Sequence, residues 1–478
     1  MEVRLKDHRS RNRSTALLLR ASLSVVIFLL LCAQWTREPL RAAPSIQADP
    51  YWSLTPDPLT IVGCEVVPVT VRINDVTNLY GADVIVSFDP TILEVVDADG
   101  NSGNGIQVEN AGMLSGRIFV ARNEANNTTG TARYAVTLLN PAPPVTGSGD
   151  FIRIYFRAKA AGTSPLHFSY FKLAETGGVE IPSTAVDGSA ITTAPNAAAV
   201  TISRLNSTTA RLSWPTVTGV DGYHIYRDTI PYFTPTGTPY ATVAAGPYDD
   251  VGALGNIATN YFYVIRSACT NGFESVNSNR VGEFDYELRE TASTDYNWIA
   301  LPLDAGLNTA ASLKTHIEGN STSAVAVSAV ETWNSVPQSY LAYYPALPFT
   351  NFALRLGGAY RVNVDVASGT STIWSLVGSV PGPDVFTYTF YETASSDYNW
   401  LMLPLNKEDI TSASVLESNI ETYAVPGASV LTIERWNSTP QSFGTYYPMF
   451  PFTNFSTRVG YPYRISVDVS SASQSVWP

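Results

Sequence analysis

The stretch NLYGADVIVSFDPTILEVV at residues 78–96 alternates apolar and polar side chains before it reaches a proline. In residues 81–88 every second side chain is apolar, which is typical of a strand with one face in a core. Asp89-Pro90 ends the pattern, because proline has no N–H to donate to a neighbouring strand. A second run, GDFIRIYFRAKAAGT at residues 149–163, ends in a glycine turn. These runs predict a β-sandwich of short strands from about residue 59 to 193.

The composition of the whole chain favours the same class of fold. A chain of 478 residues is too long for one hydrophobic core and predicts several domains. Only 15% of the residues are charged, and the chain has 26 Tyr, 32 Gly and 31 Pro. Such a composition favours β-sandwiches and tight turns over helices, so we expect a mainly β protein.

Residues 78–96 and 149–163, in this order, resemble the opening and the later paired strands of a cohesin domain. Cohesins are jelly-roll β-sandwiches, and in cellulosomes they capture dockerin domains carried by polysaccharide-degrading enzymes. The resemblance therefore implies a cohesin-like jelly roll at residues 49–194 that binds a dockerin-bearing partner or a polysaccharide. It assigns no individual binding residue, because the dockerin-facing residues vary within the family.

The next segment, residues 195–284, resembles a fibronectin type III domain. The resemblance is carried by ARLSW at 210–214, GYHIYR at 222–227 and NYFYVIR at 260–266, which match strands B, C and F of such a sandwich. It implies that Trp214 lies in the core and that Tyr261 is the corner tyrosine.

The remaining sequence is an internal repeat with copies at residues 285–384 and 385–478, the second of which ends early. Three motifs recur: ETASTDYNW at 290–298 as ETASSDYNW at 392–400, WNSVPQS at 333–339 as WNSTPQS at 436–442, and PFTNF at 348–352 and 451–455. Both copies resemble repeats of bacterial surface proteins. We expect two β-rich domains.

Each copy is also expected to contain one short helix. Apolar residues recur at the i, i+4 spacing of one helix face, as Leu313 and Ile317 and as Leu416 and Ile420. They follow Thr309 in the first copy and Ser412 in the second, and both residue types cap helix N-termini.

Residues 1–48 contain eight basic and three acidic residues. Most of the basic residues precede the apolar run of residues 21–35. This order is typical of an export signal, with an uncleaved membrane anchor as the alternative because the basic region is long. A lipoprotein site at Cys32 is disfavoured, since the bulky Leu31 precedes it. We expect the rest of the chain to be extracellular or at the cell surface.

The charge and the cysteines set further limits. The net charge is −12, and it is −17 once the +5 of residues 1–48 is left out, so phosphate backbones of nucleic acids would be repelled. Cys64 and Cys269 lie in different expected domains, and two lone cysteines give no disulfide framework. We expect each to be a small buried hydrophobe, with a bridge between them as the less favoured alternative.

The sequence offers no convergent set of catalytic residues. Outside the first 48 residues the histidines are His167, His224 and His316, one in each of three domains, so none can share a triad or zinc site. Acids such as Asp89 and Glu94 belong to the strand and turn that resemble a family without catalysis. We therefore expect a protein that is not an enzyme and has no cofactor.

Two weaker binding candidates remain. Asp97, Asp99 and Asn101 are closely spaced oxygen donors that could hold a structural calcium, although the spacing is not that of an EF-hand. The repeats are rich in aromatic residues, most of which we expect to fill their cores. Exposed tyrosines among them could stack on sugar rings, and the candidates are Tyr343, Tyr344, Tyr446 and Tyr447.

Three functions are compatible with these features. The leading one is a secreted or surface-bound scaffold in polysaccharide degradation, whose cohesin-like domain binds a dockerin-like domain or a polysaccharide while the fibronectin-like domain is a spacer. The second is a structural or adhesive surface protein built of inert β modules. The third is an accessory fragment of an enzyme. The membrane would be contacted only through residues 1–48.

Overall fold

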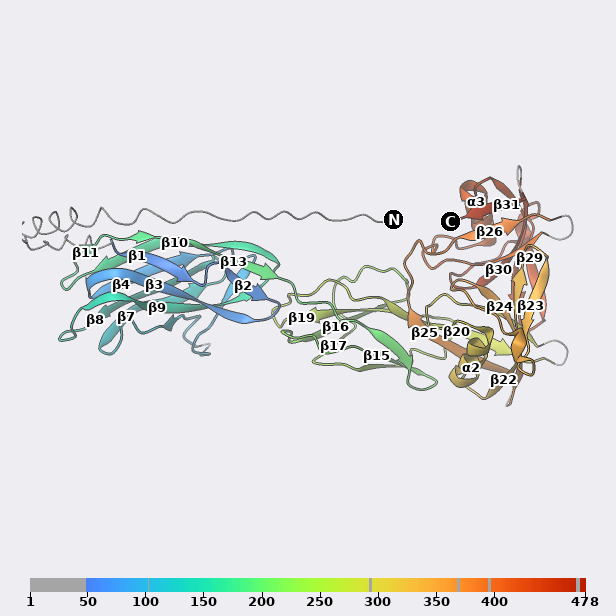
Figure 1. Ribbon diagram of the computed structural model, residues 1–478, viewed down its shortest axis with the longest axis horizontal. Helices are drawn as coiled ribbons and strands as arrows, with labels where there is room; N and C mark the ends of the chain where they lie inside the picture. Colours follow the sequence, from blue (N-terminus) through green and yellow to red (C-terminus); the bar gives the residue numbers. More distant parts are fainter. Residues whose placement is uncertain (1–48, 102, 292–294, 368–369, 394–396, 470–472) are drawn as a thin grey trace, which may run out of the picture. The chain divides into compact units, whose positions relative to one another are not determined.

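The computed structural model describes residues 49–478 apart from positions 102, 292–294, 368–369, 394–396 and 470–472 (Figure 1). The expected signal or anchor at residues 1–48 lies outside the described residues. The described chain is mainly β, as predicted, with two α-helices, α2 (Ala310–Asn320) and α3 (Ala413–Tyr423). Neither helix is long and apolar enough to cross a membrane.

The first module is a sandwich of two sheets, as the alternating runs predict (Figure 1). One sheet has the order β12-β1-β3-β9-β5, with β6 beside β9; its strands are β1 (Tyr51–Thr55), β3 (Val66–Leu79), β5 (Leu93–Val96), β6 (Glu109–Asn110), β9 (Val145–Ala158) and β12 (Thr184–Ala185). The other has the order β2-β13-β10-β4-β8-β7, with β11 beside β10; its strands are β2 (Leu59–Val62), β4 (Gly81–Ser87), β7 (Ile118–Asn126), β8 (Thr131–Leu138), β10 (Gly162–Ala174), β11 (Glu180–Ile181) and β13 (Gly188–Thr193).

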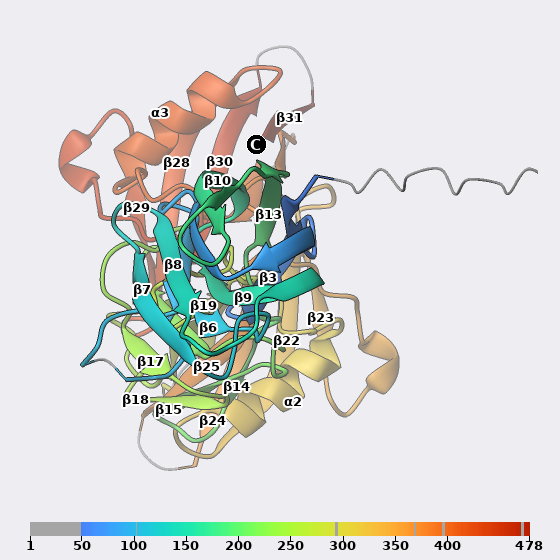
Figure 2. The ribbon, with the colours of Figure 1, turned by 90° about the vertical axis from the view of Figure 1, so that its left-hand side faces the viewer.

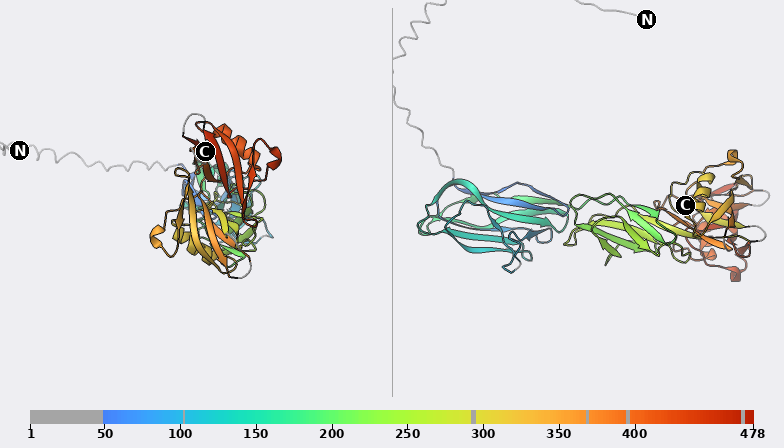
Figure 3. Two further views of the ribbon diagram at one scale, coloured as in Figure 1. Left: turned by 90° about the vertical axis from the view of Figure 1, so that its right-hand side faces the viewer. Right: turned by 90° about the horizontal axis from the view of Figure 1, so that it is seen from below.

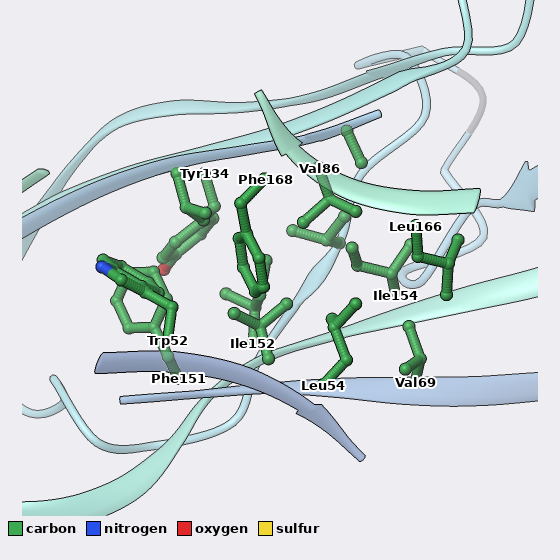
Figure 4. Packing of buried hydrophobic residues seen from close by; sticks show 14 of the residues in the cluster. Trp52, Leu54, Val69, Val86, Tyr134, Phe151, Ile152, Ile154, Leu166 and Phe168 are labelled. Atoms are coloured by element: carbon green, nitrogen blue, oxygen red, sulfur yellow. The ribbon is translucent and has the colours of Figure 1, made fainter. Parts of the chain in front are cut away.

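The core of this sandwich is filled by the alternate side chains of both sheets (Figure 4). In β4 every second residue is buried, as the sequence alternation predicts. Phe151 of β9 packs edge-on against Trp52 of β1 and Tyr134 of β8, with ring centroids 5.5 Å apart in both pairs. Because one face of each sheet is used in this way, the opposite face is left outward.

The second module is a smaller sandwich. A three-stranded sheet has the order β14 (Thr201–Arg204), β15 (Thr209–Ser213), β18 (Tyr248–Val251), and a facing sheet begins with β17 (Ala241–Val243), β16 (Gly222–Asp228), β19 (Phe262–Ala268) and β20 (Val281–Arg289). Trp214 is half-buried, with its ring 5.2 Å from that of Tyr223. The guanidinium of Arg227 covers the half-buried ring of Tyr261 at 4.2 Å. The fibronectin type III assignment stays a prediction.

Strand β20 also belongs to the first repeat copy. It pairs with β19 at Val281 and Gly282, and along its whole length with β25 (Ser371–Ser379) of the repeat. The expected boundary between residues 284 and 285 therefore falls inside a strand. The second sandwich and the first copy share a hydrophobic core, since Phe262, Phe284 and Trp374 belong to one buried cluster.

The two repeat copies have the same fold. Each contains a four-stranded sheet, in the first copy β21 (Tyr296–Ala300), β24 (Ala359–Val366), β22 (Val325–Asn334) and β23 (Ser339–Tyr343), and in the second β27 (Tyr398–Met402), β30 (Pro462–Val469), β28 (Ala428–Asn437) and β29 (Ser442–Tyr446). A further pair, β26 (Tyr388–Tyr391) and β31 (Gln474–Trp477), corresponds to β20 and β25. Each PFTNF motif contains a 3₁₀ turn, η1 (Pro348–Thr350) or η2 (Pro451–Thr453).

The two predicted helices are confirmed. Thr309 caps α2 in a capping box with Ser312, and Ser412 accepts a hydrogen bond from Val415 N at the start of α3. The apolar pairs of both helices are buried, since α2 packs against β22 and β25 and α3 against β28. Figure 2 shows α3 beside β28 and α2 beside β22.

The two copies contact each other along a seam (left view of Figure 3), and most of the motifs that they share contribute residues to it. Trp298 and Trp400 stack with ring centroids 3.4 Å apart. The indole N–H of Trp333 donates to Tyr398 O at 2.7 Å, and reciprocally that of Trp436 donates to Tyr296 O at 2.9 Å. The duplicated tryptophans therefore hold the copies together as a pair.

Cys64 and Cys269 form a disulfide, so the expectation that each is an unpaired buried hydrophobe is wrong. Cys64 follows β2 in the first sandwich, and Cys269 follows β19 in the second. Two neighbouring hydrogen bonds join the same modules, from Cys64 N to Gly219 O and from Asn271 Nδ2 to Glu94 Oε1. The bridge could not be predicted because 205 residues separate the cysteines and each sequence resemblance describes only its own module.

We expect the double variant Cys64→Ser/Cys269→Ser to fold but to lose about 2–4 kcal/mol of unfolding free energy, because the cross-link restricts the unfolded chain. Calorimetry of the two proteins measures the loss. Non-reducing peptide mapping of the unaltered protein should recover residues 64 and 269 in one cross-linked peptide; two free thiols would contradict the bridge.

The two copies differ at one buried acceptor. In the first copy the indole N–H of Trp374 donates to His316 Nδ1 at 3.1 Å, and in the second that of Trp477 donates to Asn419 Oδ1 at 3.0 Å. Burial lowers the pKa of His316 to about 4, and the nearby Arg204 charge acts in the same direction. His316 is therefore neutral in the folded protein and accepts through its unprotonated nitrogen.

This difference predicts a pH dependence of stability. The pKa of His316 is about 6.5 in the unfolded chain and about 4 in the folded one, so its stabilising contribution is complete above pH 6.5 and is lost as the pH falls towards 4. The loss should reach about 3 kcal/mol. Thermal unfolding measured from pH 7.5 to 4 should show it, and His316→Asn should fold and remove this part of the pH dependence, because asparagine accepts the same bond in the second copy. An unchanged pH profile in that variant would disprove the role of His316.

Candidate binding face of the first sandwich

The outer face of the β10-β4-β8-β7 sheet is formed by the side chains that lie between its core positions. The register of the strands places Tyr170 of β10, Ile85 of β4 and Arg133 of β8 in one row. Arg133 Nε and Nη2 donate to the two carboxylate oxygens of Asp83 at 3.1 and 2.8 Å. The hydrogen bond to Asp83 raises the pKa of the Arg133 guanidinium, so the guanidinium stays charged.

Large apolar side chains on this face are exposed. Tyr170 is 40% exposed, and Phe119 on the edge strand β7 is 58% exposed. Val120, 40% exposed at the sheet edge, pairs with the core residue Val136 and therefore lies on the inner side of the sheet. A shallow hollow between β7, β8 and β10 is lined mostly by small residues, among them Ala121, Ala135 and Ala174. Exposed apolar residues next to a fixed ion pair are typical of protein-binding surfaces, which have an apolar centre and a polar rim.

The outer face of the opposite sheet has a different character. Its side chains are paired with one another: Arg72 with Asp150, Arg153 with Glu109 at 2.9 Å, and Tyr155 with Glu109 at 2.5 Å. One end of that sheet contacts the second sandwich through Glu94, the acceptor of Asn271. Of the two outer faces, the β10-β4-β8-β7 face is the one with exposed aromatic side chains, Tyr170 and Phe119, whereas the opposite sheet exposes Val66.

The predicted calcium donors lie together in the loop after β5, where backbone groups use their oxygens. Asp97 Oδ1 accepts from Gln107 N at 3.0 Å, and Asn101 Oδ1 accepts from Gly103 N at 3.1 Å. Hydrogen bonds from Asn104 and from the Asn101 backbone lower the pKa of Asp99. Among the described residues no group of three His, Cys, Asp or Glu side chains is placed to hold a metal ion. Calcium binding stays a prediction.

The four candidate sugar-stacking tyrosines fall into two groups. Tyr343 and Tyr446 are only 7% and 3% exposed, so the expectation that they stack on sugars is wrong; they fill the cores of their copies. Tyr344 and Tyr447 are 44% and 45% exposed on the loops before η1 and η2. For these two residues glycan stacking stays a prediction.

The three histidines lie apart, each with a local partner. His167 Nδ1 is 2.6 Å from Asp187 Oδ2 in the first sandwich, His224 bonds to Glu274 in the second, and His316 accepts from Trp374 in the first repeat. They do not converge with one another, as the sequence predicts.

Sequence reasoning did not find Phe119, Arg133 and Tyr170. The signal was present in the alternation of the strands, because residues between the core positions must face outward. It could not be used, since the pattern alone does not show which outward face is free.

The first module is thus a two-sheet β-sandwich with exposed apolar side chains on one outer face. The family model of the cohesin domain matches residues 64–191, so the first module is a cohesin domain, as the resemblance implies. Cohesin domains are binding modules without catalytic activity.

Solved cohesins are similar to this part of the chain. A non-cellulosomal cohesin from the hyperthermophilic archaeon Archaeoglobus fulgidus is 12% identical over 31% of this chain and 93% of that chain, with a TM-score of 0.24. A type I cohesin–dockerin complex from Clostridium thermocellum matches at 13% identity over 30% and 100% of the chains, with a TM-score of 0.25. A type II cohesin from the cellulosome of Acetivibrio cellulolyticus matches at 16% over 30% and 95%, with a TM-score of 0.26. At these identities no binding residue can be transferred. No curated protein matches the chain significantly.

Proposed function

We propose that this chain is a non-catalytic scaffold whose cohesin domain binds a dockerin-like protein domain through the outer face of the β10-β4-β8-β7 sheet. The observation that carries this proposal is the exposure of Tyr170 and Phe119 on the outer face of a sheet that the rest of the described chain leaves uncovered. Burial of these side chains by a partner would supply the apolar centre of an interface.

Asp83 and Arg133 would complete the interface. Their bidentate pair fixes a guanidinium and a carboxylate beside the ring of Tyr170, with the Arg133 Cζ 5.9 Å from the ring centroid. Fixed charges at the rim of an apolar centre select partners with complementary charges more than they add affinity. The face thus combines a general apolar contact with a selective polar one.

The location that we propose is outside the cell or at its surface, in the context of polysaccharide degradation. The disulfide between Cys64 and Cys269 supports export, because such bonds persist in oxidising compartments. The basic and apolar sequence of residues 1–48 supports it independently. The second sandwich, which resembles fibronectin type III, would serve as a spacer between the cohesin domain and the paired repeats.

Binding to a panel of type I and type II dockerin domains tests the proposal. We expect at least one dockerin to bind the full-length protein and the variant Phe119→Ala/Tyr170→Ala to bind it at least tenfold more weakly, the loss expected for removing buried aromatic anchors. Isothermal titration gives the affinities, and Tyr51→Ala, a matched change on the opposite sheet, should leave them unchanged.

Two outcomes would contradict this function. Equal weakening by Tyr51→Ala would show that the loss is not specific to the proposed face. Failure of every dockerin in the panel to bind the full-length protein would favour the alternative, a structural or adhesive surface protein built of inert β modules.

A further inference from the structure

A cleft of about 480 Å³ lies at the seam between the repeat copies and takes its walls from both. The first copy contributes the β22–β23 hairpin and the segment before β24, and the second contributes β26 and β27. Its lining includes Trp333, Asn334, Arg355, Tyr391 and Trp400. A volume of this size is typical of small-molecule sites.

The floor of the cleft is aromatic and rigid. Trp400 is 8% exposed, stacks on Trp298, and its indole nitrogen is buried with no hydrogen-bond partner among the described residues. Trp333 is held by its bond to Tyr398 O, and the half-buried Tyr391 also lines the cleft. Rings fixed in this way can receive a flat apolar surface without losing conformational freedom.

The wall of the cleft is polar but almost uncharged. Asn334, Ser335 and Thr389 line it together with Arg355, the only charged side chain of the lining. Arg355 is exposed, and its guanidinium has no hydrogen-bond or ion-pair partner among the residues that the structure describes. A planar group with several donors is therefore available at the mouth of the cleft.

The equivalent position in the second copy is used differently. Arg458 corresponds to Arg355, and its Nη1 and Nη2 donate to Ile257 O and Ala258 O of the second sandwich at 3.0 and 3.3 Å. The cleft beside Arg458 is smaller, about 230 Å³. The second copy thus uses Arg458 to join modules, whereas the first copy leaves the guanidinium of Arg355 free beside the larger cleft.

This combination of groups fits a sugar better than other ligands. The C–H faces of a pyranose pack on aromatic rings, and its hydroxyls accept and donate hydrogen bonds to an amide, hydroxyls and a guanidinium. A nucleotide would need more than one cation, and the chain is acidic overall, with a net charge of −12. We propose that the cleft binds one oligosaccharide per chain, with Tyr391 as the stacking ring and Arg355 as the polar anchor. This site is independent of the dockerin-binding face.

Titration calorimetry of the full-length protein with cellohexaose, xylohexaose and hexagalacturonate tests the site. We expect at least one probe to bind with a stoichiometry of one. Tyr391→Ala and Arg355→Gln should each weaken binding about tenfold, the effect of losing a ring contact or a charge-assisted hydrogen bond. Preference for the acidic probe would assign a carboxylate to Arg355, and preference for a neutral one would assign ring hydroxyls.

Matched controls separate this site from the other surfaces. Tyr344→Ala removes an exposed tyrosine of the η1 loop, and Tyr170→Ala alters the cohesin face. Both variants should bind sugar with the affinity of the unaltered protein. All variants should unfold at the same temperature. The proposal is overturned if none of the three probes binds, if Tyr391→Ala and Arg355→Gln leave the affinity unchanged, or if Tyr344→Ala abolishes binding in their place.

Discussion

The period-two alternation of a β-strand is the constraint on which the structure of this protein depends. One face of each strand packs in a core, so the side chains of the other face are available for other contacts. In the cohesin domain the outward residues of one sheet pair with one another, as Arg153 does with Glu109, whereas the other sheet exposes Tyr170 and Phe119. In the repeats the outward residues of one copy meet those of the other, and Trp298 stacks on Trp400.

Features that depend on neighbouring residues could be predicted from the sequence. The strand pattern of residues 81–88, the caps at Thr309 and Ser412 and the duplication of the C-terminal half all rest on short-range spacing, and all are present in the structure. The cohesin motifs also identify their own module, because the family pattern lies within residues 64–191.

Features that depend on contacts between modules could not be predicted. The bridge between Cys64 and Cys269 needs the ends of two sandwiches to meet, and no local pattern carries that information. The burial of single tyrosines could not be predicted either. Tyr343 and Tyr344 are neighbours with the same chemistry, yet Tyr343 is buried and Tyr344 is exposed, because only Tyr343 points into the core of its sheet. The free face of the cohesin domain likewise follows from what the rest of the chain leaves uncovered.

The disulfide also determines how the protein would respond to a stretching force. Tension applied between residue 49 and the C-terminal repeats would pass along the chain to Cys64, cross the covalent bond to Cys269 and continue through β20. The segment between the two cysteines, residues 65–268, is outside that path. It includes β4, β7, β8 and β10, so these strands of the cohesin face would lie outside the covalent path of the load.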